Sequence, residues 1–226
     1  MTLRTGHPLA YPVIVTIGAL AICFAWAPFG DSEQVGLIGA VALVILGYSA
    51  FRLAIALGYL PSGIPGQTRK GEHGREVAVR RVRQQHRLVS RSWLEFTIGG
   101  RTRWLPVYFD PAFVALTQSS AELSGRAAYI DGRRVYPSGR LRDSEPVGRL
   151  IDNPARPDPQ ATAIATQAAS LGRRLLLDAQ SAIVAPFAGL LWVYVAGGGP
   201  TAFGGATVIA AAAATWLAAI RGSDPS

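Results

Sequence analysis

Four apolar stretches, two near each end of the chain, flank a polar middle of more than about a hundred residues. They run from about Tyr11 to Phe29, Val35 to Leu60, Leu175 to Gly197 and Thr201 to Ile220. The hydrocarbon core of a bilayer is about 30 Å thick, so a spanning helix needs roughly 20 mostly apolar residues. Within hydrocarbon an isolated segment satisfies its backbone groups only as a helix. The pattern predicts a membrane α-helical protein with four transmembrane helices and a small inserted domain.

Within this polar middle, residues 61–150 predict a small β-rich domain of five or six strands, arranged as an open barrel or a sandwich. Its strongest signal is the Gly99-Gly100 pair between two apolar segments, because two glycines readily adopt the positive φ of a two-residue hairpin turn. In that register Leu94 faces Leu105 and Glu95 faces Trp104.

A second hairpin is predicted to turn at Asp131-Gly132, and Asp110 is expected to cap a short helical turn that begins with Pro111. The domain also carries eight aromatic residues, which we expect to form its core rather than to stack on a ligand. They are Trp93, Phe96, Trp104, Tyr108, Phe109, Phe113, Tyr129 and Tyr136.

Residues 151–174 join this domain to the third span, and the three prolines at positions 154, 157 and 159 suit a linker better than a helix. Beyond the linker, Gln160 to Arg174 predicts an alanine-rich helix that either continues into the third span or lies along the interface. The chain thus divides into 1–60, with two spans, the domain 61–150, the linker and helix 151–174, and 175–226, with two more spans.

The orientation follows from the positive charges. Of the 22 Lys and Arg residues, 19 lie between Pro61 and Arg174, with 10 of the 14 acidic residues. The loop at 30–34 is acidic, and the loop at 197–200 is uncharged. Because Lys and Arg near the membrane stay on the cytoplasmic side, both termini and the central domain are predicted to be cytoplasmic, in the plasma (inner) membrane.

The first span has one alternative interpretation. Ala25-Trp26-Ala27 fits the small-x-small cleavage pattern of a signal peptide, and Arg4 supplies a positive charge before the apolar run. The run is longer than a usual signal-peptide core, which favours a retained helix. Cleavage would leave the orientation of the second span unchanged.

Two charged residues lie within the predicted spans. Arg52 is in the second span, where a charge costs roughly 2.5–3.5 kcal/mol at the bilayer centre, and Asp178 is near the start of the third. One hypothesis is an Arg52–Asp178 ion pair that locks these two helices together. The alternative is that Arg52 extends to the interface and Asp178 is interfacial.

The fourth span carries alanines at every fourth position, an arrangement that places small residues along one helix face. The ladder consists of Ala202, Ala206, Ala210, Ala214 and Ala218. Small faces let helices approach closely in lipid. We therefore expect a partner helix on this face, either another span of this chain or another, permease-like subunit.

The remaining positive charges predict contact with anionic lipid at the cytoplasmic leaflet. The head-group candidates are Arg69, Lys70, Arg173 and Arg174, and the basic run 75–87 is expected to be a solvated strand face. No nucleic-acid-binding motif accompanies the charge, so no nucleic acid is expected. The three histidines show no metal-ligand spacing and no catalytic motif is present, which predicts no enzyme activity, cofactor or metal.

The amino-acid composition indicates the kind of genome that encodes the chain. The chain has one cysteine, Cys23, which excludes an internal disulfide, and its 21 arginines against one lysine are typical of a GC-rich genome. The β-domain carries the segments Trp93-Leu94-Glu95-Phe96 and Trp104-Leu105-Pro106-Val107-Tyr108. The layout of two spans, a cytoplasmic β-domain and two more spans resembles that of small mycobacterial membrane proteins. Among them it is similar to the accessory four-helix subunit of Mce-type lipid importers.

The resemblance implies a non-catalytic subunit beside a permease, with ATP hydrolysis and substrate passage on other chains. The leading hypothesis is therefore an accessory or stabilising subunit of a plasma-membrane complex, such as an Mce-type ABC lipid importer. The alternative is an independent membrane protein whose basic cytoplasmic β-domain binds anionic lipid and regulates envelope synthesis.

Overall fold

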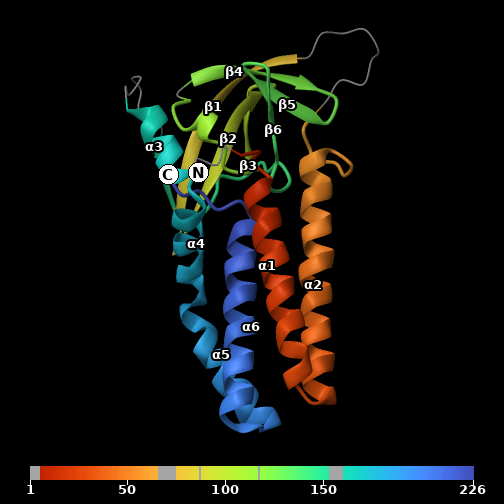
Figure 1. Ribbon diagram of the computed structural model, residues 1–226. Helices are drawn as coiled ribbons and strands as arrows, with labels where there is room; N and C mark the ends of the chain where they lie inside the picture. Colours follow the sequence, from red (N-terminus) through yellow and green to blue (C-terminus); the bar gives the residue numbers. More distant parts are fainter. Residues whose placement is uncertain (1–5, 66–74, 87, 117, 153–159) are drawn as a thin grey trace.

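The computed structural model describes residues 6–65, 75–86, 88–116, 118–152 and 160–226. Four helical segments form a bundle beneath a curled β-domain (Figure 1). The bundle consists of α1 (Ala10–Trp26), α2 (Ser32–Leu57), the segment α4 (Leu171–Ala179), η3 (Gln180–Val184) and α5 (Ala185–Ala196), and α6 (Gly199–Ile220). The short helix η1 (Ala27–Phe29) follows α1.

All four segments are long and apolar enough to cross a membrane: Ala10–Phe29, Ser32–Leu57, Leu171–Ala196 and Gly199–Ile220. They correspond to the four predicted stretches and indicate a multi-pass membrane protein. Inside the bundle, α1 and α6 share a core in which Tyr11, Val15 and Ala19 pack with Trp216 and Ile220. Large apolar side chains such as Tyr194, 88% exposed, cover the outer surface, as expected for helices solvated by lipid.

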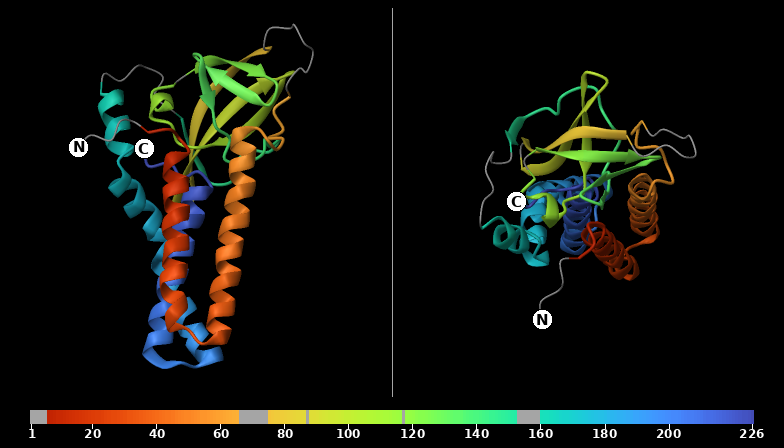
Figure 2. Two further views of the ribbon diagram at one scale, coloured as in Figure 1. Left: turned by 45° about the vertical axis from the view of Figure 1, so that its right-hand side comes forward. Right: turned by 90° about the horizontal axis from the view of Figure 1, so that it is seen from above.

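The β-domain is a single antiparallel sheet that curls into a half-barrel (Figure 2). The strand order is β3-β2-β1-β4-β5-β6, and β7 pairs with the far end of β1. The strands are β1 (Arg75–His86), β2 (Val89–Ile98), β3 (Arg101–Val107), β4 (Gln118–Ser124), β5 (Ala127–Ile130), β6 (Arg133–Val135) and β7 (Arg149–Asp152). Seven strands replace the five or six expected, because β4 is mostly polar and β7 has only four residues, so that neither gives a clear periodic signal.

Both predicted hairpins are present. Across the Gly99-Gly100 turn, Leu94 pairs with Leu105 and Glu95 with Trp104, as expected. The two glycines have φ of 60° and 74°, values that L side chains rarely adopt. At the second turn Asp131 has φ 49°, the conformation that aspartate tolerates best after asparagine and glycine.

The domain core contains Val79, Leu94, Phe96, Leu105 and Ile130 on one face of the sheet. Six of the eight aromatic residues are buried, namely Trp93, Phe96, Trp104, Tyr108, Phe109 and Phe113, and Tyr129 and Tyr136 are partly buried. The short helix η2 (Pro111–Phe113) begins where predicted, with Asp110 accepting a hydrogen bond from the Ala112 amide at 2.9 Å.

The predicted helix from Gln160 to Arg174 is interrupted. Helix α3 (Ala161–Ala168) is followed by its C-cap Ala169, Ser170 is extended with ψ 135°, and α4 starts at Leu171. The third apolar segment thus begins four residues earlier than expected and contains both Arg173 and Arg174. The proline-rich positions 153–159 lie outside the described residues.

Candidate functional site: a groove of small residues at the far end of the bundle

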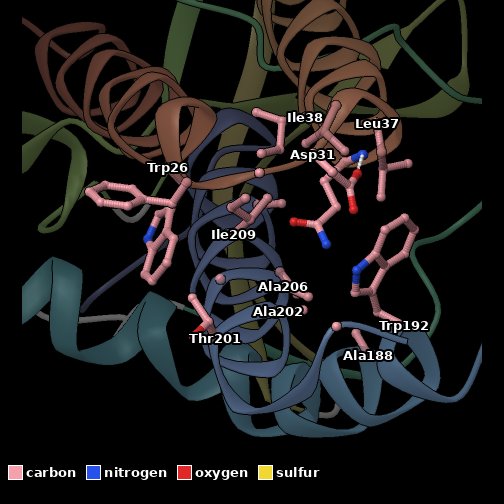
Figure 3. A pocket seen from close by; sticks show the side chains of 18 residues that line it. Trp26, Asp31, Leu37, Ile38, Ala188, Trp192, Thr201, Ala202, Ala206 and Ile209 are labelled. Atoms are coloured by element: carbon pink, nitrogen blue, oxygen red, sulfur yellow. Dashed lines mark hydrogen bonds between the residues drawn. The ribbon is translucent and has the colours of Figure 1, made fainter. Parts of the chain in front are cut away.

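A groove of about 450 Å³ opens between α2, α5 and α6, at the end of the bundle remote from the β-domain (Figure 3). We call it the alanine groove. Its floor is the predicted alanine face of α6, of which Ala202, Ala206 and Ala210 line the cavity. The other lining residues are Trp26, Phe29, Gly30, Asp31, Gln34, Leu37, Ile38, Val41, Ala188, Trp192, Gly198, Thr201, Gly205, Ile209 and Ala213.

The groove exists because the floor residues end in single methyl groups, which do not fill the space between α2 and α5. In Figure 3 the Trp192 ring extends from α5 toward Leu37 of α2, while Ala202 and Ala206 lie beside them on α6. Ala202 is 8% exposed and Ala218 is 5% exposed, but Ala206, Ala210 and Ala214 are only partly buried. Ala218 therefore packs within the chain, Ala202 is mostly covered at the edge of the groove, and Ala206 and Ala210 are the ladder residues that the groove leaves partly exposed.

Glycines bring the neighbouring helices close to α6. A Cβ on Gly205 would lie 3.2 Å from the Trp26 ring, so the absence of a side chain lets that indole pack on α6. A Cβ on Gly189 of α5 would collide with Thr207 Oγ1 and lie 3.0 Å from the Phe203 carbonyl oxygen. These two contacts fix the walls of the groove.

The groove has a polar rim. Asp31 caps α2 by accepting a hydrogen bond from the Gln34 amide at 2.8 Å, which occupies one carboxylate oxygen. Gly198 is the N-cap of α6, with φ 95°, and a Cβ there would lie 3.3 Å from Gln34 Nε2. An apolar floor with a polar rim at one end suits the side chains of a helix or another long apolar group.

The predicted Arg52–Asp178 pair is not among the ion pairs of the described residues. Asp178 instead accepts hydrogen bonds from the Tyr11 hydroxyl at 2.6 Å and the Ser223 hydroxyl at 2.8 Å. The Arg52 guanidinium lies over the Tyr48 ring, 5.6 Å from its centroid. Depth in the membrane was the only basis for the pair, and it carries no information about which side of the bundle each helix occupies.

The head-group candidates have different environments. Arg69 and Lys70 lie outside the described residues. Arg173 is exposed, whereas Arg174 is 7% exposed and its guanidinium stacks 3.8 Å from the centroid of the Tyr11 ring and 5.4 Å from that of Phe109. Arg174 therefore has little surface left for lipid, and its position joins α4 to α1 and the β-domain.

Sequence reasoning found the alanine floor but missed the walls of the groove, Trp26 and Trp192, because each is apolar among other apolar residues of a span. Among the described residues, no three His, Cys, Asp or Glu side chains gather closely enough to hold a metal ion. Comparisons with protein-family models, with curated proteins and with solved structures each found no match to this chain.

Proposed function

We propose that this protein is a non-catalytic accessory subunit of a plasma-membrane complex, and that the alanine groove receives an apolar segment of a partner subunit. The complex class that the sequence layout favours is an Mce-type ABC lipid importer. The observation that carries the proposal is the alanine groove itself, a cavity of about 450 Å³ in the part of the bundle that lipid or a partner must cover.

Lipid chains are as apolar as leucine, so helices in a bilayer gain little from burying large apolar side chains. They associate where small residues allow close packing. Ala206 and Ala210, the partly buried ladder residues that line the groove, offer such a surface, since part of each is not used within the chain. Larger side chains of a partner helix would fill the space that these methyl groups leave.

The arrangement in the membrane follows from the distribution of charge. With the arginine-rich β-domain in the cytoplasm, the groove lies toward the opposite leaflet. The partner is then recognised within the membrane, while the β-domain remains available to cytoplasmic parts of the same complex.

The test is purification of the tagged full chain from its native host in a mild detergent, followed by mass spectrometry of the recovered proteins. We expect stoichiometric recovery of a permease and an ATPase. Ala206→Leu with Ala210→Leu fills the groove and should lower recovery at least about tenfold without lowering the melting temperature. The matched control is Ala179→Leu with Ala196→Leu, two exposed positions outside the groove.

Recovery of the chain alone, under conditions that keep other membrane complexes intact, would contradict the accessory role. Equal recovery with the groove variant and with the control would exclude the groove as the contact. If the stoichiometric partners are not a permease and its ATPase, the accessory role stands and the assignment to an ABC lipid importer is excluded.

A further inference from the structure

A second cavity, of about 480 Å³, lies at the opposite end of the bundle, where α2 and the residue after α6 meet the β-domain. We call it the arginine pocket because five arginines line it: Arg52, Arg91, Arg140, Arg142 and Arg221. The other lining residues are Tyr48, Phe51, Ile55, Trp93, Pro106 and Gly139. No acidic residue is among them.

The charge of the pocket is not neutralised within the described part of the chain. The ion pairs there join other arginines to acids, as in Arg81–Asp224 and Arg103–Asp143, and none involves an arginine of the pocket. Arg52 Nε is buried and has no hydrogen-bond partner among the described residues. Burial lowers the pKa of Arg91, and the charges of Arg221 and Arg52 lower it further, as expected where like charges share a partly enclosed space.

Aromatic side chains, rather than carboxylates, hold three of the guanidinium groups in place. Arg52 lies over Tyr48, Arg142 lies 5.5 Å from the centroid of the Trp93 ring, and Arg221 Nε donates to the Tyr48 hydroxyl at 3.4 Å. A guanidinium on an aromatic face keeps its N–H donors free in the plane of the group. The pocket therefore presents positioned N–H donors, and no carboxylate among its lining residues accepts from them.

A glycine makes the room for Arg52. A Cβ on Gly139 would lie 3.0 Å from Pro106 Cγ and 3.5 Å from Arg52 Nη1. The side chain of Arg52 thus passes from α2 to the loop that follows β6, and it links the membrane-crossing helix to the β-domain. Arg52 lies five residues before the last residue of α2, Leu57, which is about 7.5 Å along the axis at 1.5 Å per residue.

That depth is where lipid head groups meet the end of a spanning helix. Arginine binds phosphate oxygens through two parallel N–H bonds, and the negative charge of a phosphate would offset the repulsion among the arginines that face it. Phe51, on the wall of the pocket, is 41% exposed and provides an apolar surface beside the charged one. A cavity of 480 Å³ has room for a phosphate with the glycerol or sugar attached to it.

We propose that the arginine pocket binds a phosphate-bearing anion, and that its source is the head group of an anionic phospholipid in the leaflet next to the β-domain. The phosphate accepts hydrogen bonds from Arg52 and Arg91, Arg140 and Arg142 close over it from the β-domain, and the acyl chains run along Phe51. This site is independent of the alanine groove and of the accessory role.

The experiment uses the purified full chain in detergent, with delipidation and then addition of phosphatidylglycerol or phosphatidylcholine, read out as bound lipid by native mass spectrometry. We expect bound phosphatidylglycerol in at least about tenfold excess over phosphatidylcholine. Arg52→Gln with Arg91→Gln should lose this preference, and Arg140→Gln with Arg142→Gln, which alters only exposed positions, should weaken it. The charge-matched control, Arg101→Gln with Arg149→Gln, changes exposed arginines outside the pocket.

A second arm distinguishes the source of the phosphate. Thermal stabilisation of the delipidated chain by phosphatidylglycerol, but not by millimolar glycerol 3-phosphate, assigns the site to a lipid head group. Equal stabilisation by phosphatidylglycerol and glycerol 3-phosphate would mean that the pocket binds phosphate but that its ligand is a soluble compound. Equal binding of the two lipids, or equal loss of binding in the pocket variants and in the charge-matched control, would overturn the proposal.

Discussion

Arg81 and Asp224 form an ion pair of 2.6 Å in which both side chains are almost completely buried, 3% and 0% exposed. Arg81 belongs to β1, and Asp224 follows α6, so this pair joins the β-domain to the last segment of the bundle. The Asp224 amide also donates to the Ser90 carbonyl at 2.8 Å, and the Ser226 hydroxyl donates to the carboxylate at 2.6 Å. The two parts of the molecule are thus connected by a buried polar network as well as by chain continuity.

We predict that Asp224→Asn destabilises the protein by about 3–5 kcal/mol, because it removes the buried carboxylate that pairs with the buried Arg81 guanidinium. The matched control is Asp143→Asn. Asp143 also pairs with an arginine, Arg103 at 3.2 Å, but its side chain is 81% exposed, so its loss should cost at most about 1 kcal/mol. Denaturant unfolding of the purified chain in detergent measures both. Equal, small effects would show that the network does not hold the β-domain on the bundle.

The same pair predicts a dependence of stability on pH. Burial alone would raise the pKa of Asp224, but the Arg81 charge and the hydroxyl groups of Ser226 and Ser92 outweigh it and lower the pKa below its usual value. A carboxylate with a lowered pKa stabilises the folded state above its unfolded pKa of about 3.9, and this contribution disappears as the pH falls through the folded value.

The difference in unfolding free energy between the unaltered chain and Asp224→Asn should therefore be constant from about pH 7 to about pH 5 and shrink below about pH 3.9. Unfolding curves of the two chains at a series of pH values measure it. A difference that grows on acidification would mean that Asp224 is protonated in the folded state at neutral pH.

The elements that the sequence predicted correctly are those specified by neighbouring residues. Each apolar span is a continuous run, and the register across Gly99-Gly100 follows once the turn is known, because side chains alternate along a strand. The alanine ladder of α6 is likewise local, since its four-residue spacing alone places it on one face.

The features that could not be predicted are assembled from distant segments. The arginine pocket combines residues of α2, β2, the loop after β6 and the end of α6, and no short motif unites them. Asp178 has a buried tyrosine and a serine as partners instead of Arg52, because the order of the helices around the bundle decides which side chains meet. Asp224 lies outside every periodic element, so nothing in its surroundings in the sequence marks it as buried.

Close packing of α5 on α6 gives a third prediction. Gly189→Ala should destabilise the bundle, because its Cβ would collide with Thr207 Oγ1 and press on the Phe203 carbonyl, which belongs to the helix backbone and cannot move away alone. We expect a cost of about 1–3 kcal/mol, typical of overpacking. Gly204→Ala is the matched control: a Cβ there meets nothing within 4 Å, and the change should be neutral or stabilising by up to about 1 kcal/mol. Thermal unfolding in detergent compares them, and equal melting temperatures would contradict the close approach.

The fourth prediction concerns orientation, and the single cysteine makes it accessible to labelling. Cys23 is 2% exposed, and replacing it by alanine gives a background without thiols. Ser144→Cys then places a thiol on the exposed surface of the β-domain, and Ser32→Cys places one at the opposite end of the bundle. If the arginine-rich domain is cytoplasmic, as the distribution of Lys and Arg predicts, a membrane-impermeant maleimide added to intact cells reaches only the thiol at position 32.

Permeabilisation should then label position 144 to the same extent, which serves as the internal control for reactivity. The reverse pattern would place the β-domain outside the membrane and would move the arginine pocket to the outer leaflet. It would also place the alanine groove on the cytoplasmic side, so partners would have to be sought among proteins that approach the bundle from there. Equal labelling of both positions in intact cells would mean that the four helices do not separate the two ends of the bundle by a membrane, and the proposed function would fail with it.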